Sequence, residues 1–120
     1  MPKNTALVIE DDVDLSEIFS KALERAGFEV ETICDGKIAQ DHLKEVVPNV
    51  IALDLHLPHV DGTTLLKQIN ADERLSKTRV ILTTADAAQA EFLRELADIV
   101  LIKPISFSQL RDISARLKVG

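Results

Sequence analysis

The chain has 120 residues, of which 46% are hydrophobic, and a formal net charge of −6 at pH 7. This length suits one domain with a sizeable core, so we expect a single domain over residues 1–120, with no effector domain. The acidic charge argues against direct binding of nucleic acid, and the absence of a long apolar run or apolar leader segment argues for a cytoplasmic protein rather than a membrane protein.

The first part of the chain alternates two kinds of pattern. Residues 6–9 form a β-branched apolar run, which predicts a buried strand. Residues 15–26 carry apolar side chains at helical spacing, including Ile18, and Gly27 follows where a helix C-cap is expected. Residues 28–33 alternate apolar and charged side chains, which places this strand at an edge of the sheet.

The rest of the chain continues the alternation. Helices are expected over 38–46, 65–69, 87–96 and 107–117, and apolar strands over 50–53, 80–82 and 99–102. The helix over 87–96 has the weakest pattern, because only Phe92, Leu93 and Leu96 offer bulk for burial. We expect this helix to be the loosest.

Five strands alternating with five helices predict an α/β fold: a doubly wound (βα)5 sandwich with a mostly parallel sheet and helices on both faces. Runs that are apolar on both faces are expected in the middle of the sheet. In such folds the functional site lies at the carboxyl ends of the strands, near the point where the strand order reverses.

Chemically distinctive residues follow four of the predicted strands. They are Glu10, Asp11 and Asp12 after the first, Asp54 after the third, Thr84 after the fourth, and Lys103 after the fifth. Carboxylates from two strand ends repel one another, and a hard divalent cation relieves that repulsion. Mg²⁺ typically takes one or two protein carboxylates and completes its shell with water and phosphate oxygens. The pattern therefore predicts a magnesium site for phosphoryl chemistry.

Each of these residues also has a purely structural interpretation. Asp12 could be only a helix N-cap, Thr84 a hydroxyl bonded to backbone, and Lys103 a surface lysine. Asp54 is harder to explain in this way, because an ionisable group directly after four apolar strand residues is partly desolvated and needs a partner.

Other polar residues are expected to be structural. His42 falls on the apolar side of a predicted helix, as a packed or rim histidine. His56 and His59 could form a metal pair, but Mg²⁺ prefers oxygen ligands. Cys34, the only cysteine, is expected to be a packing residue in a reducing compartment.

In their order along the chain, these motifs resemble the receiver domain of two-component response regulators. The resemblance rests on residues 7–12, on the segment from Asp54 through Pro58, Asp61 and Gly62, on Thr84 with Ala85, and on Lys103 with Pro104. It covers essentially the whole chain. It implies a flavodoxin-like fold with strand order 2-1-3-4-5 and a cis peptide bond before Pro104.

The resemblance also implies a function. Asp54 would accept a phosphoryl group from a sensor histidine kinase or a phosphotransfer protein, with Lys103 and Thr84 contacting that group. Mg²⁺ would be held by Glu10, Asp11, Asp54 and the backbone carbonyl of His56. The domain would be a regulatory switch rather than an enzyme, although it could assist its own phosphorylation and dephosphorylation.

Two positions depart from the family pattern and concern the output of the switch. Val100 stands where an aromatic residue usually reports the switch, and Leu96 stands where a glycine commonly ends the fourth helix. The surface of the fourth helix, fifth strand and fifth helix is expected to bind a downstream protein or a second copy of the domain.

Two other classes remain as alternatives. A receiver-like interaction module would keep the fold without being phosphorylated, but the retained acids, Thr84 and Lys103 argue against it. A phosphatase of the haloacid dehalogenase type would also use an aspartate nucleophile with Mg²⁺. In that family the nucleophile lies in an Asp-x-Asp motif. Here His56 occupies the position of the second aspartate.

Overall fold

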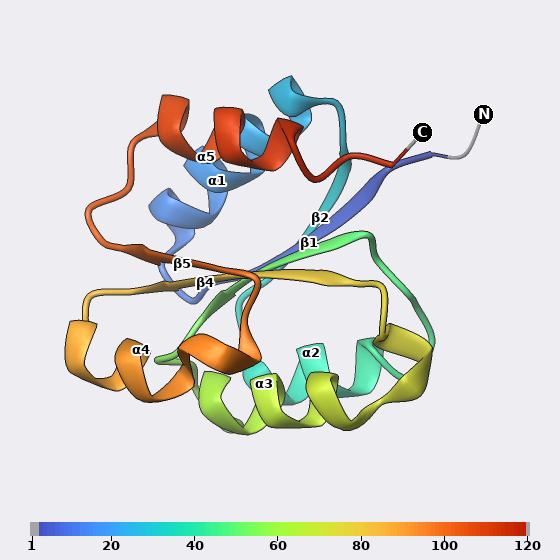
Figure 1. The fold of residues 1–120 in the computed structure, drawn as a ribbon, viewed down its shortest axis with the longest axis vertical. Coiled ribbons are helices and arrows are strands. Elements are labelled where there is room, and N and C mark those ends of the chain that lie inside the picture. The colour runs from blue at the N-terminus through green and yellow to red at the C-terminus, as the bar shows by residue number, and fades with distance from the viewer. Residues whose placement is uncertain (1–2, 120) are drawn as a thin grey trace.

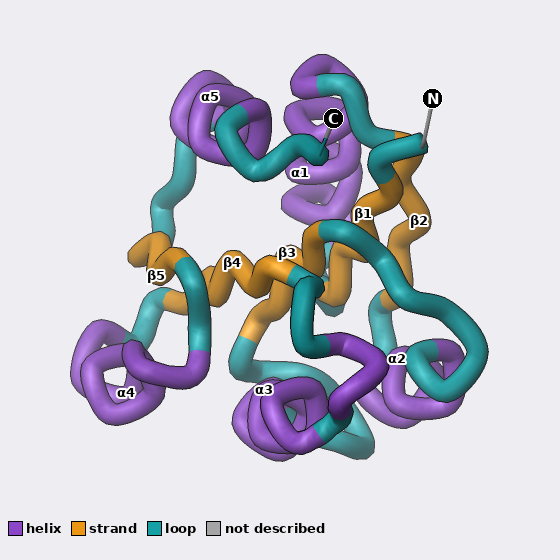
Figure 2. Tube along the Cα trace, turned by 45° about the vertical axis from the view of Figure 1, so that its right-hand side comes forward, coloured by secondary structure: helices purple, strands orange, loops and turns teal. Residues whose placement is uncertain are grey.

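A computed structural model describes residues 3–119, and within that range five parallel strands form one sheet (Figure 1). The strands are β1 (Thr5–Ile9), β2 (Glu29–Ile33), β3 (Val50–Asp54), β4 (Arg79–Thr84) and β5 (Ile99–Ile102). Their order is β2-β1-β3-β4-β5, and Figure 2 shows them side by side across the molecule. This confirms the doubly wound flavodoxin-like fold.

Helices cover both faces of the sheet. They are α1 (Val13–Ala26), α2 (Gly36–His42), α3 (Gly62–Ala71), α4 (Ala87–Leu93) and α5 (Phe107–Ala115), with 3₁₀ turns η1 (Glu73–Leu75) and η2 (Arg94–Leu96). α1 and α5 lie on one face, and α2, α3 and α4 lie on the other (Figure 1). None of the helices in this part of the chain is long and apolar enough to cross a membrane.

Alternate residues of each central strand supply two separate cores. In β1, Ala6 and Val8 pack with Phe19 of α1 on one face, whereas Leu7 and Ile9 pack on the other. All five residues of β3 are buried. A strand covered on both faces needs an unbroken apolar run, and the central strands β1, β3 and β4 each have one.

The capping residues of α1 match the sequence. The Asp12 carboxylate accepts a hydrogen bond from the Leu15 N–H over 3.1 Å and begins the helix. Gly27 ends it with a φ of 109°, a left-handed conformation that glycine adopts without strain. Ile18 was expected on the apolar stripe but is 42% exposed, because it lies at the margin of the face that buries Phe19 and Ala22.

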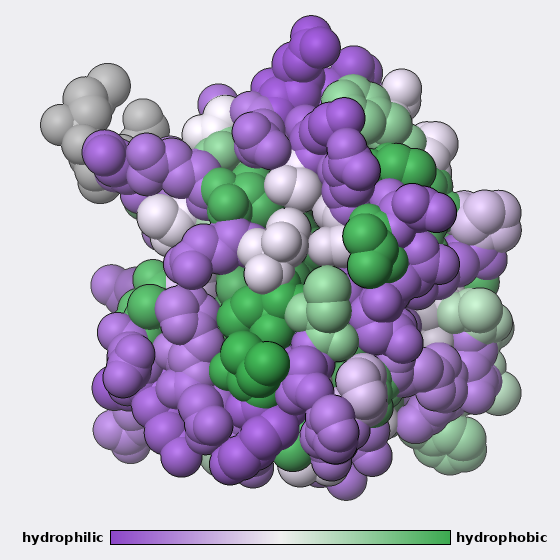
Figure 3. Space-filling view, turned by 180° about the vertical axis from the view of Figure 1, so that it is seen from behind, coloured by the Kyte–Doolittle hydropathy of each residue, from purple (hydrophilic) through white to green (hydrophobic). Residues whose placement is uncertain are grey.

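The two edges of the sheet differ in how well they were predicted. β2 is an edge strand with Glu29 and Glu31 exposed, as expected. The apolar run of β5 also lies at an edge, not in the middle, and Ile102 is 42% exposed there. Seen from behind, the surface is mostly hydrophilic, with a strip of hydrophobic groups through its middle (Figure 3).

Two side chains expected inside the protein lie outside. Phe92 is 90% exposed, because Ala90 and Leu93 form the buried side of α4 and Phe92 points away from it. Cys34 is also exposed, in the loop after β2, so it is not a packing residue. His42 is partly buried at the rim of α2, with Nε2 3.2 Å from Glu31, as expected of a structural histidine.

Candidate functional site

The register of the sheet brings the predicted site residues to one rim. Ile9 pairs with Leu53, so Glu10 follows β1 beside Asp54 at the end of β3. Thr84 pairs with Ile102, so Lys103 follows β5 at the same rim. Parallel strands thus carry residues that are far apart in the sequence to a common edge.

Three carboxylates converge at this rim. Glu10, Asp11 and Asp54 each offer an oxygen atom, and these atoms all lie within 4.8 Å of one another. Glu10 and Asp54 are buried, whereas Asp11 is exposed. Within residues 3–119 this is the cluster with the spacing of a metal site, and neither His56 nor His59 belongs to it.

Lys103 neutralises part of this negative charge. Its ammonium nitrogen lies 2.6 Å from Glu10 Oε1 and 3.5 Å from Asp54 Oδ1. Burial opposes the charged form of Lys103, but the hydrogen bond to Glu10 and the charge of Asp54 outweigh it and raise the pKa of the lysine above 10.5. Lys103 is followed by a cis peptide bond to Pro104, as the resemblance implied.

Glu10 is the most strongly perturbed acid of the site. Burial raises its pKa from 4.5 to about 7, with a further contribution from the charge of Asp54, although the hydrogen bond from Lys103 opposes the change. Its second oxygen, Oε2, accepts the backbone N–H of Asp12 over 3.2 Å. Both oxygens of this carboxylate therefore have partners inside the protein.

Thr84 ends β4 and is fully buried. Its hydroxyl oxygen accepts the backbone N–H of Asp86 over 3.0 Å, and its backbone carbonyl accepts the N–H of Lys103 over 2.8 Å. Asp86 in turn caps α4 by accepting the N–H of Gln89. The predicted switch hydroxyl is therefore bound to the start of the following helix.

The loop from Asp54 to α3 is held by close backbone contacts. A Cβ atom at Gly62 would lie 2.1 Å from the carbonyl oxygen of Asp54, so only glycine fits there. Asp61 caps α3 by accepting the N–H of Thr64, which lowers the pKa of the aspartate. The loop residue His56 is exposed.

The contacts between this loop and the start of α2 were not predicted from the sequence. The N–H of Gly36 donates to the carbonyl oxygen of Pro58 over 3.1 Å, and Asp35 contacts Nδ1 of His59, whose φ is 71°. Asp35 also caps α2. This cap was predictable from the sequence, because an Asp stands three residues before Ile38. Its contact with His59 spans 24 residues and had no local signal.

The fold and this rim define a flavodoxin-like α/β domain with an acidic site at its strand ends. The model of the response regulator receiver domain matches residues 6–115, and the chain belongs to this family. It is thus a receiver domain of the kind found in two-component response regulators. Such domains are regulatory, bind Mg²⁺ at an acidic site and interact with histidine kinases or phosphotransfer proteins.

Individual relatives agree with this assignment. The probable methanogenesis regulatory protein FilR2 of Methanothrix harundinacea is 34% identical over 123 residues, covering 93% of this chain and 79% of the relative. The phosphate regulon transcriptional regulatory protein PhoB of Rhizobium meliloti is 35% identical over 106 residues, covering 86% of this chain but 47% of the relative. The chain likewise spans less than half of several other curated relatives.

Solved structures show the same likeness. The bacteriophytochrome response regulator RtBRR is 32% identical with a TM-score of 0.81, covering 100% of this chain and 80% of that one. The chemotaxis response regulator CheY4 of Vibrio cholerae has a TM-score of 0.87 over 98% of this chain and 100% of that one. At 22% identity, this second likeness supports the fold alone.

Proposed function

We propose that Asp54 is the phosphoacceptor of this receiver domain and that Glu10, Asp11, Lys103 and Thr84 complete its site. The observation that carries the proposal is the convergence of three carboxylates within 4.8 Å, with the Lys103 ammonium 3.5 Å from Asp54. A lysine and an acidic cluster beside one buried carboxylate suit a nucleophile that receives a negatively charged group.

The reaction is an in-line displacement at phosphorus. An oxygen of the Asp54 carboxylate forms the new bond to phosphorus, while the bond from phosphorus to the donor histidine nitrogen breaks and its electron pair stays on that nitrogen. Lys103 lies where its charge would stabilise the phosphoryl oxygens. The Thr84 hydroxyl would then donate a hydrogen bond to one of those oxygens, which gives the switch its second arrangement.

The residues present suit Mg²⁺, the cation that receiver domains bind. The donor set is made of oxygen atoms from Glu10, Asp11 and Asp54, as a hard divalent cation requires. The carbonyl oxygen of His56 accepts none of the hydrogen bonds found among the described residues, so it is available as a further ligand. When bound, the cation would supply positive charge to the transferred phosphoryl group.

Phosphorylation of Asp54 is tested by intact mass. After incubation with Mg²⁺ and acetyl phosphate, the wild type should gain one phosphoryl group, and Asp54→Asn should gain none. Asp12→Asn is the matched control, since Asp12 lies at the same rim but outside the acidic cluster, and it should be phosphorylated like the wild type. A gain of mass by Asp54→Asn would refute the assignment, and no gain by the wild type would favour the interaction module.

The metal ligands are tested by calorimetric titration, because the chain has no Tyr or Trp to report binding by fluorescence. Glu10→Gln with Asp11→Asn should bind Mg²⁺ at least tenfold more weakly than the wild type, while the fold remains intact. An unchanged dissociation constant would show that these acids do not hold the cation.

We further propose that α4, β5 and α5 form the surface that binds a downstream protein or a second copy, in the cytoplasm. The observation that favours this surface is the exposure of Phe92 in α4 and Ile102 in β5. Large exposed apolar side chains mark interaction surfaces when they gather on one face. Light scattering with and without phosphorylation tests for self-association, and Phe92→Ser should weaken it without preventing phosphorylation of Asp54.

A further inference from the structure

A hydrogen bond outside the acidic site joins the starts of α3 and α4. The side-chain amide of Gln89 donates to the hydroxyl oxygen of Thr63 over 3.0 Å, in a partly buried position. Thr63 lies in the first turn of α3, and Gln89 lies in the first turn of α4. Each of these helices begins after a residue of the proposed site: α3 follows the loop from Asp54, and α4 follows Thr84.

The α3 end of this contact is attached firmly to Asp54. The N–H of Gly62 donates to the carbonyl oxygen of Leu55 over 2.8 Å. The backbone at Gly62 approaches the Asp54 carbonyl so closely that a Cβ atom would lie 2.1 Å from it. Because such close packing leaves no room for sliding, the start of α3 stays with β3 when the neighbouring segment moves.

The α4 end of the contact is linked to Thr84. The Thr84 hydroxyl accepts the N–H of Asp86 over 3.0 Å, and the Asp86 carboxylate accepts the N–H of Gln89 over 2.9 Å. If Thr84 moves toward a phosphoryl group on Asp54, it either stretches its hydrogen bond with Asp86 or carries the start of α4 with it. A moving α4 separates Gln89 from Thr63, since α3 stays in place.

We infer that the hydrogen bond between Gln89 and Thr63 is a latch that holds the segment from Thr84 to Gln89 in its resting arrangement. The two residues are positioning residues for Thr84, and the inference rests on the proposed roles of Thr84 and Asp54. Beyond the C-terminal end of α4, Asn70 of α3 donates to the carbonyl oxygen of Leu96 in η2 over 2.7 Å. That contact holds η2 against α3, so we expect the movement of α4 to be largest at its N-terminal end.

A latch that exists only in the resting arrangement lowers the affinity for any ligand that requires the other arrangement. Beryllofluoride with Mg²⁺, a noncovalent analogue of a phosphoryl group, is such a ligand. Gln89→Ala and Thr63→Val should each bind it about two- to tenfold more tightly than the wild type, the range expected when one hydrogen bond is lost from the resting state. The double variant should bind no more tightly than the better single variant.

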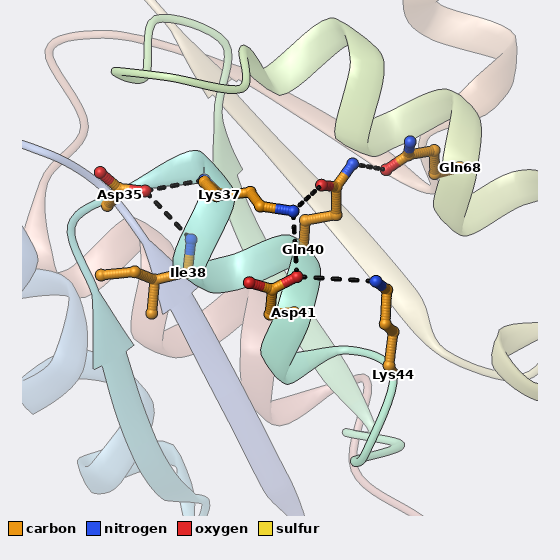
Figure 4. A network of polar contacts seen from close by, with 7 residues as sticks. All are labelled: Asp35, Lys37, Ile38, Gln40, Asp41, Lys44 and Gln68. Carbon is orange, nitrogen blue, oxygen red and sulfur yellow. Dashed lines mark hydrogen bonds and ion pairs between the residues drawn. The ribbon is translucent and has the colours of Figure 1, made fainter.

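The chain offers a matched control. Gln40 of α2 and Gln68 of α3 form a similar side-chain hydrogen bond of 2.9 Å between neighbouring helices, away from Thr84 (Figure 4). Gln40→Ala should therefore leave beryllofluoride affinity unchanged, and all variants should bind Mg²⁺ alone like the wild type. These two readouts separate a latch from a general loosening of the helices.

The outcomes distinguish failure of the latch from failure of the proposed function. If the wild type binds beryllofluoride but Gln89→Ala and Thr63→Val bind it equally or more weakly, the latch is refuted and the phosphoacceptor stands. A parallel change in affinity for Mg²⁺ alone, or the same tightening in Gln40→Ala, also refutes the latch. If the wild type binds no beryllofluoride, the proposed function fails and the latch fails with it.

Discussion

The Lys103 ammonium lies 2.6 Å from the Glu10 carboxylate, although 93 positions separate the two residues in the chain. The contact joins the end of β1 to the end of β5 across the proposed phosphorylation site. The contact partly offsets the free-energy cost of burying Glu10. Without Lys103, the Glu10 carboxylate would lie beside the charge of Asp54 with no neutralising partner.

Removing the charge of Glu10 should stabilise the metal-free protein at alkaline pH. Its pKa is raised from 4.5 to about 7, so between these values the folded protein keeps a proton that the unfolded chain has lost. The contribution of Glu10 therefore favours folding below pH 4.5 and is lost as the pH rises through 7. Urea unfolding should show that Glu10→Gln is more stable than the wild type by about 1–3 kcal/mol at pH 8, with a smaller gain at pH 5.

The same comparison has an internal control. Glu17→Gln changes an exposed glutamate of α1 that pairs with Lys21, and it should change the free energy of unfolding little, because an exposed ion pair contributes little to stability. A stability difference for Glu10→Gln that is equal at pH 5 and pH 8 would contradict the raised pKa.

Substitution of Gly62 should damage both stability and phosphorylation. In Gly62→Ala the new Cβ atom would lie 2.1 Å from the carbonyl oxygen of Asp54, so β3 and α3 must separate at the proposed phosphoacceptor. We expect a loss of about 2–4 kcal/mol in the free energy of unfolding and slower phosphorylation by acetyl phosphate. Thr64→Ala, on the exposed side of the same helix, should be phosphorylated at the wild-type rate.

Ser114 offers a test of the packing between α1 and α5. Its hydroxyl group is fully buried and has no hydrogen-bond partner among the described residues. Because an unpaired buried hydroxyl is costly, Ser114→Ala should raise the free energy of unfolding by about 1 kcal/mol without changing phosphorylation. Ser108→Ala, at an exposed position of the same helix, should have little effect. Destabilisation by Ser114→Ala would mean that the hydroxyl is satisfied in solution.

Phosphorylation should change amide hydrogen exchange mainly between Thr84 and Leu101. Val100 is β-branched and short, so it cannot swing between buried and exposed positions as an aromatic side chain does. The signal must then pass through movement of α4, whose N-terminal end is bound to Thr84 through Asp86. Thr84→Ala should reduce the change without preventing phosphorylation. A response confined to α1 and α2 would place the output elsewhere.

The sequence was sufficient for features that depend on neighbouring residues. The apolar run before Asp54 predicted a buried central strand, and Gly27 predicted the end of α1; both are confirmed. The residues that follow the strands also lie together, as expected, because the carboxyl ends of adjacent parallel strands lie at the same edge of the sheet.

Features that depend on distant packing were not predictable in this way. The pattern of α4 offered three bulky residues but did not reveal that the helix is seven residues long and buries Leu93 rather than Phe92. The run of β5 is as apolar as that of a central strand, yet the chain provides no sixth strand to pair with it among residues 3–119. The contact of Asp35 with His59 likewise depends on how two loops meet.

The exposed position of Cys34 makes the protein convenient to observe. It is the only cysteine in the chain, and the preceding residue, Ile33, accepts the backbone N–H of Glu10 over 3.1 Å. A thiol-reactive fluorophore would therefore attach at a single place, one residue from a direct contact with the acidic rim. In a chain without Tyr or Trp, such a label would be the sole strong fluorescent signal, and it could follow metal binding and phosphoryl transfer in real time with no engineered residue.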